Sequence, residues 1–84
     1  MTNNEAKQLA QALKKQFGGK VEYEPVNTLG RYRFAITSKN FDGIPHLQRQ
    51  DAIWKVVDQV LARESTLDVS MILAFAPADL ATVN

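Results

Sequence analysis

The stretch that decides the fold is residues 31–61, RYRFAITSKNFDGIPHLQRQDAIWKVVDQVL. Before the turn at Phe41–Pro45, large apolar residues alternate with polar or small ones, which is the period-two pattern of a half-buried strand. After the turn, Leu47, Trp54 and Leu61 recur at helical spacing. The hydrophobic period changes within a few positions, so the turn joins a strand to a helix.

The turn and the start of the following helix contain residues that favour a transition from strand to helix. Gly43 tolerates a positive φ, and Pro45 fits the first helical position, where its missing N–H does no harm. We expect the helix to run from about Pro45 to Arg63, with polar residues such as Arg49 on its solvated side. The expected apolar face comprises Leu47, Ile53, Trp54, Val56, Val57, Val60 and Leu61.

The segment before this stretch predicts a helix and the first strand of a β-hairpin. An apolar stripe at helical spacing ends at Phe17, and Asn3 or Asn4 is its candidate N-cap. Lys20–Val26 then alternates as a strand that ends near a proline, which suits a sheet edge. The turn Asn27–Gly30 brings the next strand back beside it.

The complete element order predicts an α+β fold of the type α-β-β-α-β. The strand Arg31–Ser38 presents Tyr32, Phe34 and Ile36 inward, and Asp68–Phe75 forms a last, nearly continuous apolar strand. A right-handed crossover makes these two strands parallel, which gives a three-stranded mixed sheet with both helices on one face. We expect residues 1–84 to form a single domain, ending in a short helical turn or a frayed segment.

Composition narrows the classes of function. The 84 residues are 45% apolar and 23% charged, with a net charge of +1, so no strong overall field attracts nucleic acid or a membrane. The absence of cysteine excludes disulfides and thiolate metal sites within this chain. Neither a membrane helix nor a signal peptide is indicated, so a cytoplasmic location is expected.

The central stretch resembles a known family. Ile36–Gly43, the spacing onward to Arg49 and Ile53-Trp54, and the ending Ala76–Asp79 are similar to BolA-like proteins over residues 31–79. The resemblance implies the α-β-β-α-β fold, which is similar to a type II KH fold. It also implies a small non-enzymatic regulator that pairs with a monothiol glutaredoxin and shares an iron–sulfur cluster with it. Some members are proposed to bind DNA and to act in stress response and cell-shape control.

The family's cluster ligands are replaced in this sequence. Asp68 stands where the family has a histidine near the start of its last strand, and the loop Asn27–Gly30 lacks the His or Cys of many members. Arg49-Gln50 occupies the position of a common Arg-His pair. Carboxylate and amide oxygens are poor ligands for iron–sulfur centres, which argues against cluster sharing by the usual residues. The resemblance therefore implies a partner surface at Asn27, Gly30, Gln50 and Asp68, and the chain is expected to hold no cofactor of its own.

The alternative is a nucleic-acid-binding module. Four basic residues near the open sheet face and the turn could bind phosphates: Arg31, Arg33, Lys39 and Arg49. Against this, charged residues on a strand also protect a sheet edge, and Glu22 and Glu24 could pair with the arginines. A Gly-x-x-Gly loop between helices, as a KH domain would carry, is missing from the sequence.

The remaining candidates for chemistry do not predict an enzyme. His46 is the single histidine, and one imidazole makes neither a metal site nor an acid–base pair. Trp54 and Met71–Phe75 are expected in the core. The sequence thus predicts an adaptor or regulator, present as a monomer or weak homodimer, that acts through a protein partner.

Overall fold

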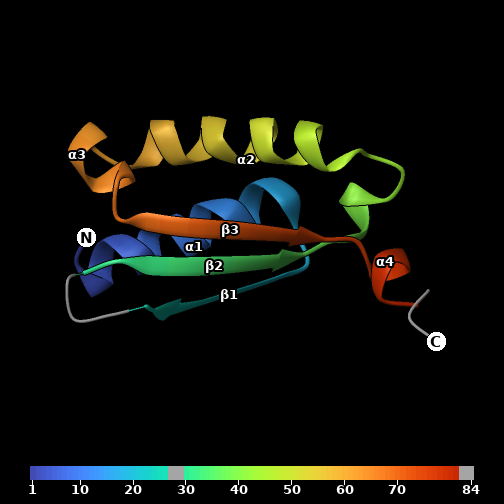
Figure 1. Ribbon diagram of the computed structural model, residues 1–84, viewed down its shortest axis with the longest axis horizontal. Coiled ribbons are helices and arrows are strands. Elements are labelled where there is room, and N and C mark those ends of the chain that lie inside the picture. Colours follow the sequence, from blue (N-terminus) through green and yellow to red (C-terminus); the bar gives the residue numbers. More distant parts are fainter. Residues whose placement is uncertain (27–29, 82–84) are drawn as a thin grey trace.

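A computed structural model describes residues 1–26 and 30–81, which form a three-stranded sheet with helices against it (Figure 1). The elements are α1 (Asn3–Phe17), β1 (Lys20–Pro25), β2 (Tyr32–Thr37), the 3₁₀ turn η1 (Lys39–Phe41), α2 (His46–Val60), α3 (Arg63–Thr66), β3 (Val69–Phe75) and α4 (Pro77–Ala81). The predicted order of helices and strands is confirmed; the described residues add two short helical turns, η1 and α3, and α4 lies where a terminal helical turn was expected.

The sheet has the predicted topology. Its strand order is β1-β2-β3, with β2 antiparallel to β1 and parallel to β3. Phe34 in β2 lies opposite Tyr23 in β1 and Ile72 in β3, so inward-facing side chains of all three strands meet in one row. The parallel pairing required by the strand–helix–strand unit is therefore present.

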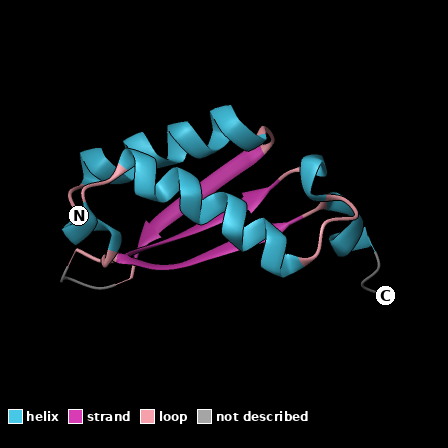
Figure 2. Cartoon of the chain, turned by 90° about the horizontal axis from the view of Figure 1, so that it is seen from above, coloured by secondary structure: helices cyan, strands magenta, loops and turns pink. Residues whose placement is uncertain are grey.

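The core lies between the sheet and the two long helices. Helix α1 packs on β1 and β2, and α2 packs on β3, so the helices lie side by side on one sheet face (Figure 2). Phe34 and Ile36 of β2 are fully buried in a core that also contains residues of both helices, as their inward pattern predicted. The largest fully buried side chains are Phe34, Leu9, Leu13, Ile36, Ile53 and Val57. The opposite sheet face is uncovered by any described helix (Figure 1).

The N-terminal cap of α1 is Thr2, so the prediction of Asn3 or Asn4 is wrong. The Thr2 hydroxyl accepts from the Glu5 N–H, and the Glu5 carboxylate accepts from the Thr2 N–H. This reciprocal capping box satisfies two backbone donors, which an asparagine one residue later could not do with Glu5.

Helix α2 is shorter than predicted and faces differently. It ends at Val60, because Leu61 is extended, and Pro45 is its N-cap instead of its first helical residue. Arg49 is only 5% exposed and Leu47 is 76% exposed, so both assignments to a face are wrong. Arg49 precedes Ile53 by one helical turn and shares its buried face, whereas Leu47 lies off that face.

Strand β3 is buried on one side only. Ile72 and Ala74 face the helices, but Met71 and Leu73 are 46% and 42% exposed. The prediction that the whole run Met71–Phe75 is core was therefore wrong for these two, because nothing among the described residues covers the second face. No helix in the described part of the chain is long and apolar enough to cross a membrane.

Candidate functional site

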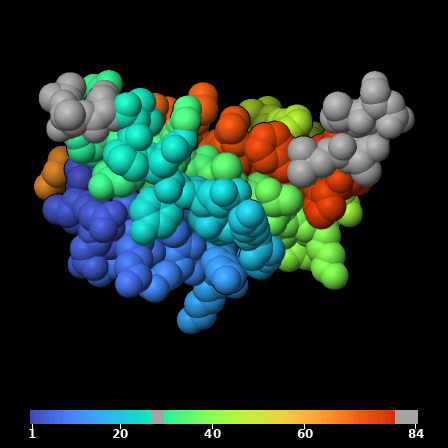
Figure 3. All heavy atoms as spheres, turned by 90° about the horizontal axis from the view of Figure 1, so that it is seen from below, coloured from blue at the N-terminus to red at the C-terminus, as the bar shows by residue number. Residues whose placement is uncertain are grey.

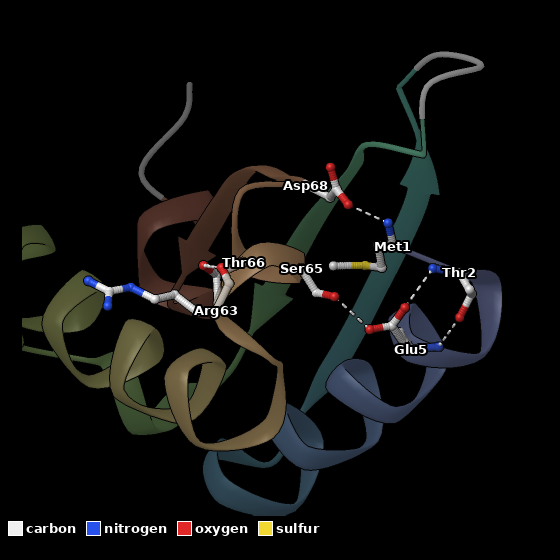
Figure 4. A network of polar contacts seen from close by, with 7 residues as sticks. All are labelled: Met1, Thr2, Glu5, Arg63, Ser65, Thr66 and Asp68. Atoms are coloured by element: carbon white, nitrogen blue, oxygen red, sulfur yellow. Dashed lines mark hydrogen bonds and ion pairs between the residues drawn. The ribbon is translucent and has the colours of Figure 1, made fainter.

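The start of β3, the start of β2 and the N-terminus meet at one end of the molecule (Figure 4). The Asp68 carbonyl accepts from the Tyr32 N–H at 2.8 Å, and the Asp68 carboxylate forms an ion pair with the Met1 amino group. Gly30 has a φ of 78°, and a Cβ there would lie 3.2 Å from the Met1 carbonyl oxygen. The structure thus brings together Gly30 and Asp68, two of the four predicted partner-surface residues.

A polar network holds the segment that leads to Asp68. The Ser65 hydroxyl of α3 donates to the Glu5 carboxylate of α1 at 2.8 Å (Figure 4). The Thr2 N–H and the Ser65 hydroxyl both lower the pKa of Glu5, with the Thr2 backbone making the larger contribution. Because Glu5 also completes the α1 cap, it links α3 to the start of α1.

An exposed leucine lies beside Asp68. Leu67 is 78% exposed and lines a surface hollow with Arg63, Glu64 and Thr66. Val26, just past β1 and bonded to Arg31 at the same end of the sheet, is also exposed. Sequence reasoning missed Leu67, because one apolar residue between a short helix and a strand carries no periodic signal. We call Val26, Gly30, Leu67 and Asp68 the Asp68 end.

Two predicted partner-surface residues are not part of the Asp68 end. Asn27 lies outside the described residues. The Gln50 side chain donates to the Ile72 carbonyl at 2.8 Å and accepts from the Trp54 indole at 3.1 Å. Ile72 is four residues beyond Asp68, about 13 Å along an extended strand. The Gln50 amide therefore satisfies a backbone carbonyl of the edge strand β3, and it does not lie next to Asp68.

The four candidate phosphate-binding residues do not form one patch. Arg33 forms an exposed ion pair with Glu24, as the alternative interpretation of the strand charges proposed. Lys39 follows the far end of β2, about 26 Å from Arg31 at eight residues of extended strand. Arg49 is buried. Nucleic-acid binding by these residues stays a prediction that the geometry does not favour.

Arg49 is a buried side chain that links three segments of the chain at the end of the sheet opposite Asp68. Its guanidinium donates to the carbonyls of Ile44 at 2.7 Å and Ala74 at 3.1 Å, and to the Asp79 carboxylate at 2.7 Å. It also lies 5.8 Å from the centre of the Phe41 ring. These contacts join the turn after β2, the end of β3 and α4. The prediction that Arg49 is solvated is therefore wrong.

Comparison with known proteins identifies the fold. No family model and no curated protein sequence matches the chain. Among solved structures, BolA1 from Arabidopsis thaliana superimposes with a TM-score of 0.72 at 17% identity, covering 93% of this chain and 98% of that one. The fold is BolA-like. The BolA domain of SufE1 from Arabidopsis thaliana gives 0.68 at 18% identity, with 94% and 98% covered.

The sequence resemblance implies an iron–sulfur cluster shared with a partner, and the residues at the Asp68 end do not offer the thiolate or imidazole ligands that such a cluster prefers. The described residues contain no group of three or more His, Asp or Glu side chains placed to hold a metal, and the chain has no cysteine. His46 begins α2 near Asp79, beyond the C-terminal end of β3, whereas Asp68 precedes that strand. The seven residues of β3 separate them by about 23 Å, so the single imidazole and Asp68 cannot share a metal ion.

Acid is expected to weaken the BolA-like fold through Glu5 and Asp79. The Arg49 side chain and then the Ala76 N–H lower the pKa of Asp79, and the Glu5 pKa is lowered as described. A carboxyl group whose pKa is lower in the folded state than in the unfolded state contributes its full stabilisation at neutral pH. This stability declines below about pH 4 and is lost once the pH passes the folded-state values. Urea unfolding at stepped pH should show a flatter acid slope in the Glu5→Gln/Asp79→Asn variant, and an unchanged slope would contradict this account.

Proposed function

We propose that this chain is a non-enzymatic adaptor or regulator of the cytoplasm that binds a protein partner, a monothiol glutaredoxin, through its Asp68 end. The BolA-like fold supports the class of protein, and the sequence resemblance supports the class of partner. The observation that carries the proposal is the exposed Leu67 next to Asp68, at the position where the resemblance places the partner contact.

The Asp68 end has the form of a small docking surface. Leu67 is a large apolar side chain held out from the fold by α3, which Glu5 anchors. Val26 adds a second exposed apolar side chain across the sheet. A few apolar anchors surrounded by polar groups carry most of the energy in many protein interfaces. The surface is small, so a transient complex is expected, as for an adaptor.

The proposal separates partner binding from cluster binding. Asp68 offers a carboxylate that is already paired with the Met1 amino group, and no described imidazole lies near it. Partner recognition here rests on shape and apolar contact. We therefore expect similar affinity for a glutaredoxin with or without its cluster, and no change in the visible spectrum of the cluster on mixing.

The test compares two matched variants by isothermal titration calorimetry with a monothiol glutaredoxin. Leu67→Asp is expected to weaken binding about tenfold or more, since it removes an apolar anchor. Leu47→Asp is the control, because Leu47 is equally exposed and lies at the opposite end of the molecule. Equal weakening by both variants, or absence of binding by the unmodified chain, would reject the proposal.

A further inference from the structure

The sheet face turned away from the helices has an uneven distribution of side chains. Across the middle row, Glu22 of β1, Ala35 of β2 and Leu73 of β3 lie opposite one another. In the neighbouring row, Glu24 of β1 lies opposite Arg33 of β2, and Arg33 lies opposite Met71 of β3. The β3 side of this face is apolar and the β1 side is charged. Figure 3 shows the β1 residues at the surface, between α1 and the residues of β2 and β3.

A hollow of about 350 Å³ occupies the middle of this face. Ala35 lies between the longer side chains of Glu22 and Leu73, which leaves the space open. A cavity of about 150 Å³ holds a benzene molecule, so this hollow has room for at least one large apolar side chain. Met71 is flexible and can adapt to such a side chain.

The charges beside the hollow favour a basic partner. Its lining contains two carboxylates, Glu22 and Glu24, and one guanidinium, that of Arg33. The Arg33 guanidinium already forms an ion pair with the Glu24 carboxylate. Glu22 has only a loose 3.6 Å contact with Lys20, and both side chains are largely exposed, so this pair contributes little. A cation from a partner can pair with Glu22 at small cost.

The dimensions of the face fit one helix better than a second copy of the chain. From β3 to β1 the face spans two strand spacings, about 10 Å, which matches the diameter of an α-helix. Its length, the seven residues of β3, is about 23 Å, or roughly 15 helical residues. The footprint of about 200–300 Å² is well below the roughly 800 Å² per partner of a stable protein interface, so a dimer held by this face alone would be unstable and a single helix is expected to bind it transiently.

We propose that the open face of the sheet is a second docking surface, and that its occupant is an amphipathic helix of a protein partner. The helix lies along the strands with its apolar stripe on Met71 and Leu73. One large apolar side chain enters the hollow over Ala35. Basic residues on the flank of the helix pair with Glu22. This surface is separate from the Asp68 end and does not depend on it.

The probe is a synthetic 16-residue helical peptide with leucines along one face and lysines on the flank. Two control peptides have the same leucines with glutamates for lysines, and the same composition in scrambled order. Each is titrated into the ¹⁵N-labelled full chain. The basic amphipathic peptide is expected to shift the amides of Arg33, Ala35, Met71 and Leu73. The acidic peptide is expected to bind about tenfold more weakly.

Two variants separate the hollow from the charge. Ala35→Leu fills the hollow and should weaken the basic peptide about tenfold, while Glu22→Gln should weaken it about threefold. Asp58→Asn removes an exposed carboxylate from α2 and should leave binding unchanged. The amide spectrum of each variant verifies folding, and Glu22→Gln suffices if Ala35→Leu does not fold.

Three results would overturn the proposal. The first is binding of the scrambled or acidic peptide as tight as that of the basic one. The second is a shift map centred on residues outside the open face, or no shift at all. The third is a shift of the Ala35, Met71 and Leu73 amides with protein concentration alone, which would make a second copy the occupant.

Discussion

Replacing Gly19 with alanine is expected to destabilise the fold by about 2–5 kcal/mol. Gly19 has a φ of 74°, and a Cβ there would lie 2.1 Å from the Thr37 carbonyl oxygen and 3.0 Å from the Ser38 Cα. Both obstacles are backbone atoms at the end of β2, so neither can move aside without disturbing the β1–β2 pairing. Urea unfolding of the Gly19→Ala variant measures the loss.

Gly43→Ala is the matched control for this clash. Gly43 also has a φ of 74°, but a Cβ there would meet nothing within 4 Å. Only the backbone strain remains, which costs about 1–2 kcal/mol. The difference between the two free energies of unfolding isolates the close approach of the turn between α1 and β1 to the end of β2. Equal losses would show that the Thr37 contact does not constrain the fold.

Removal of the Arg49 side chain is the second large effect. Arg49→Ala is expected to cost about 2–4 kcal/mol, because it removes a buried side chain and leaves the Ile44 and Ala74 carbonyls without their guanidinium donor. Arg49→Lys should recover little, since an ammonium cannot reproduce the planar fork that reaches three acceptors.

Arg31→Ala provides the comparison for Arg49. Arg31 is exposed at the start of β2, so its loss should change the free energy of unfolding by no more than about 0.5 kcal/mol. Chemical denaturation of the three variants at neutral pH tests both expectations. A loss below about 1 kcal/mol for Arg49→Ala would contradict the role of Arg49 as a connector of η1, β3 and α4.

Periodicity in the sequence was sufficient to predict the main elements. The alternation of Tyr32, Phe34 and Ile36 identified the central strand and its inward face, and both are confirmed. The change to helical spacing placed α2, and the crossover rule placed β3 parallel to β2. These features depend on local repeats and on topology, which a single sequence contains.

The roles of Arg49 and Leu47 could not be predicted this way. A hydrophobic pattern assigns arginine to solvent and leucine to the core. Arg49 is buried because acceptors from the turn after β2, from β3 and from α4 converge on it, and they come from distant parts of the sequence. Leu47 is exposed because helical geometry places it off the buried face of α2. The many apolar residues of this helix made the predicted apolar face too broad, so it included Leu47.

The candidate site was predicted only in part. Asp68 and Gly30 follow from the resemblance, and the structure places them together. Leu67 became visible only as an exposed side chain beside Asp68. Gln50 was separated from this group because its side chain turns to the β3 edge, a contact that spacing along the chain does not indicate.

The measurement that tests the central claim most directly is an NMR titration of the ¹⁵N-labelled chain with a monothiol glutaredoxin, once with and once without its cluster. The account predicts shifts of the amides of Gly30, Leu67 and Asp68 in both titrations, with the amides of Lys39 and Leu47 at the opposite end unchanged. Shifts centred on Lys39 and Leu47, shifts only with the loaded glutaredoxin, or unchanged spectra would contradict it.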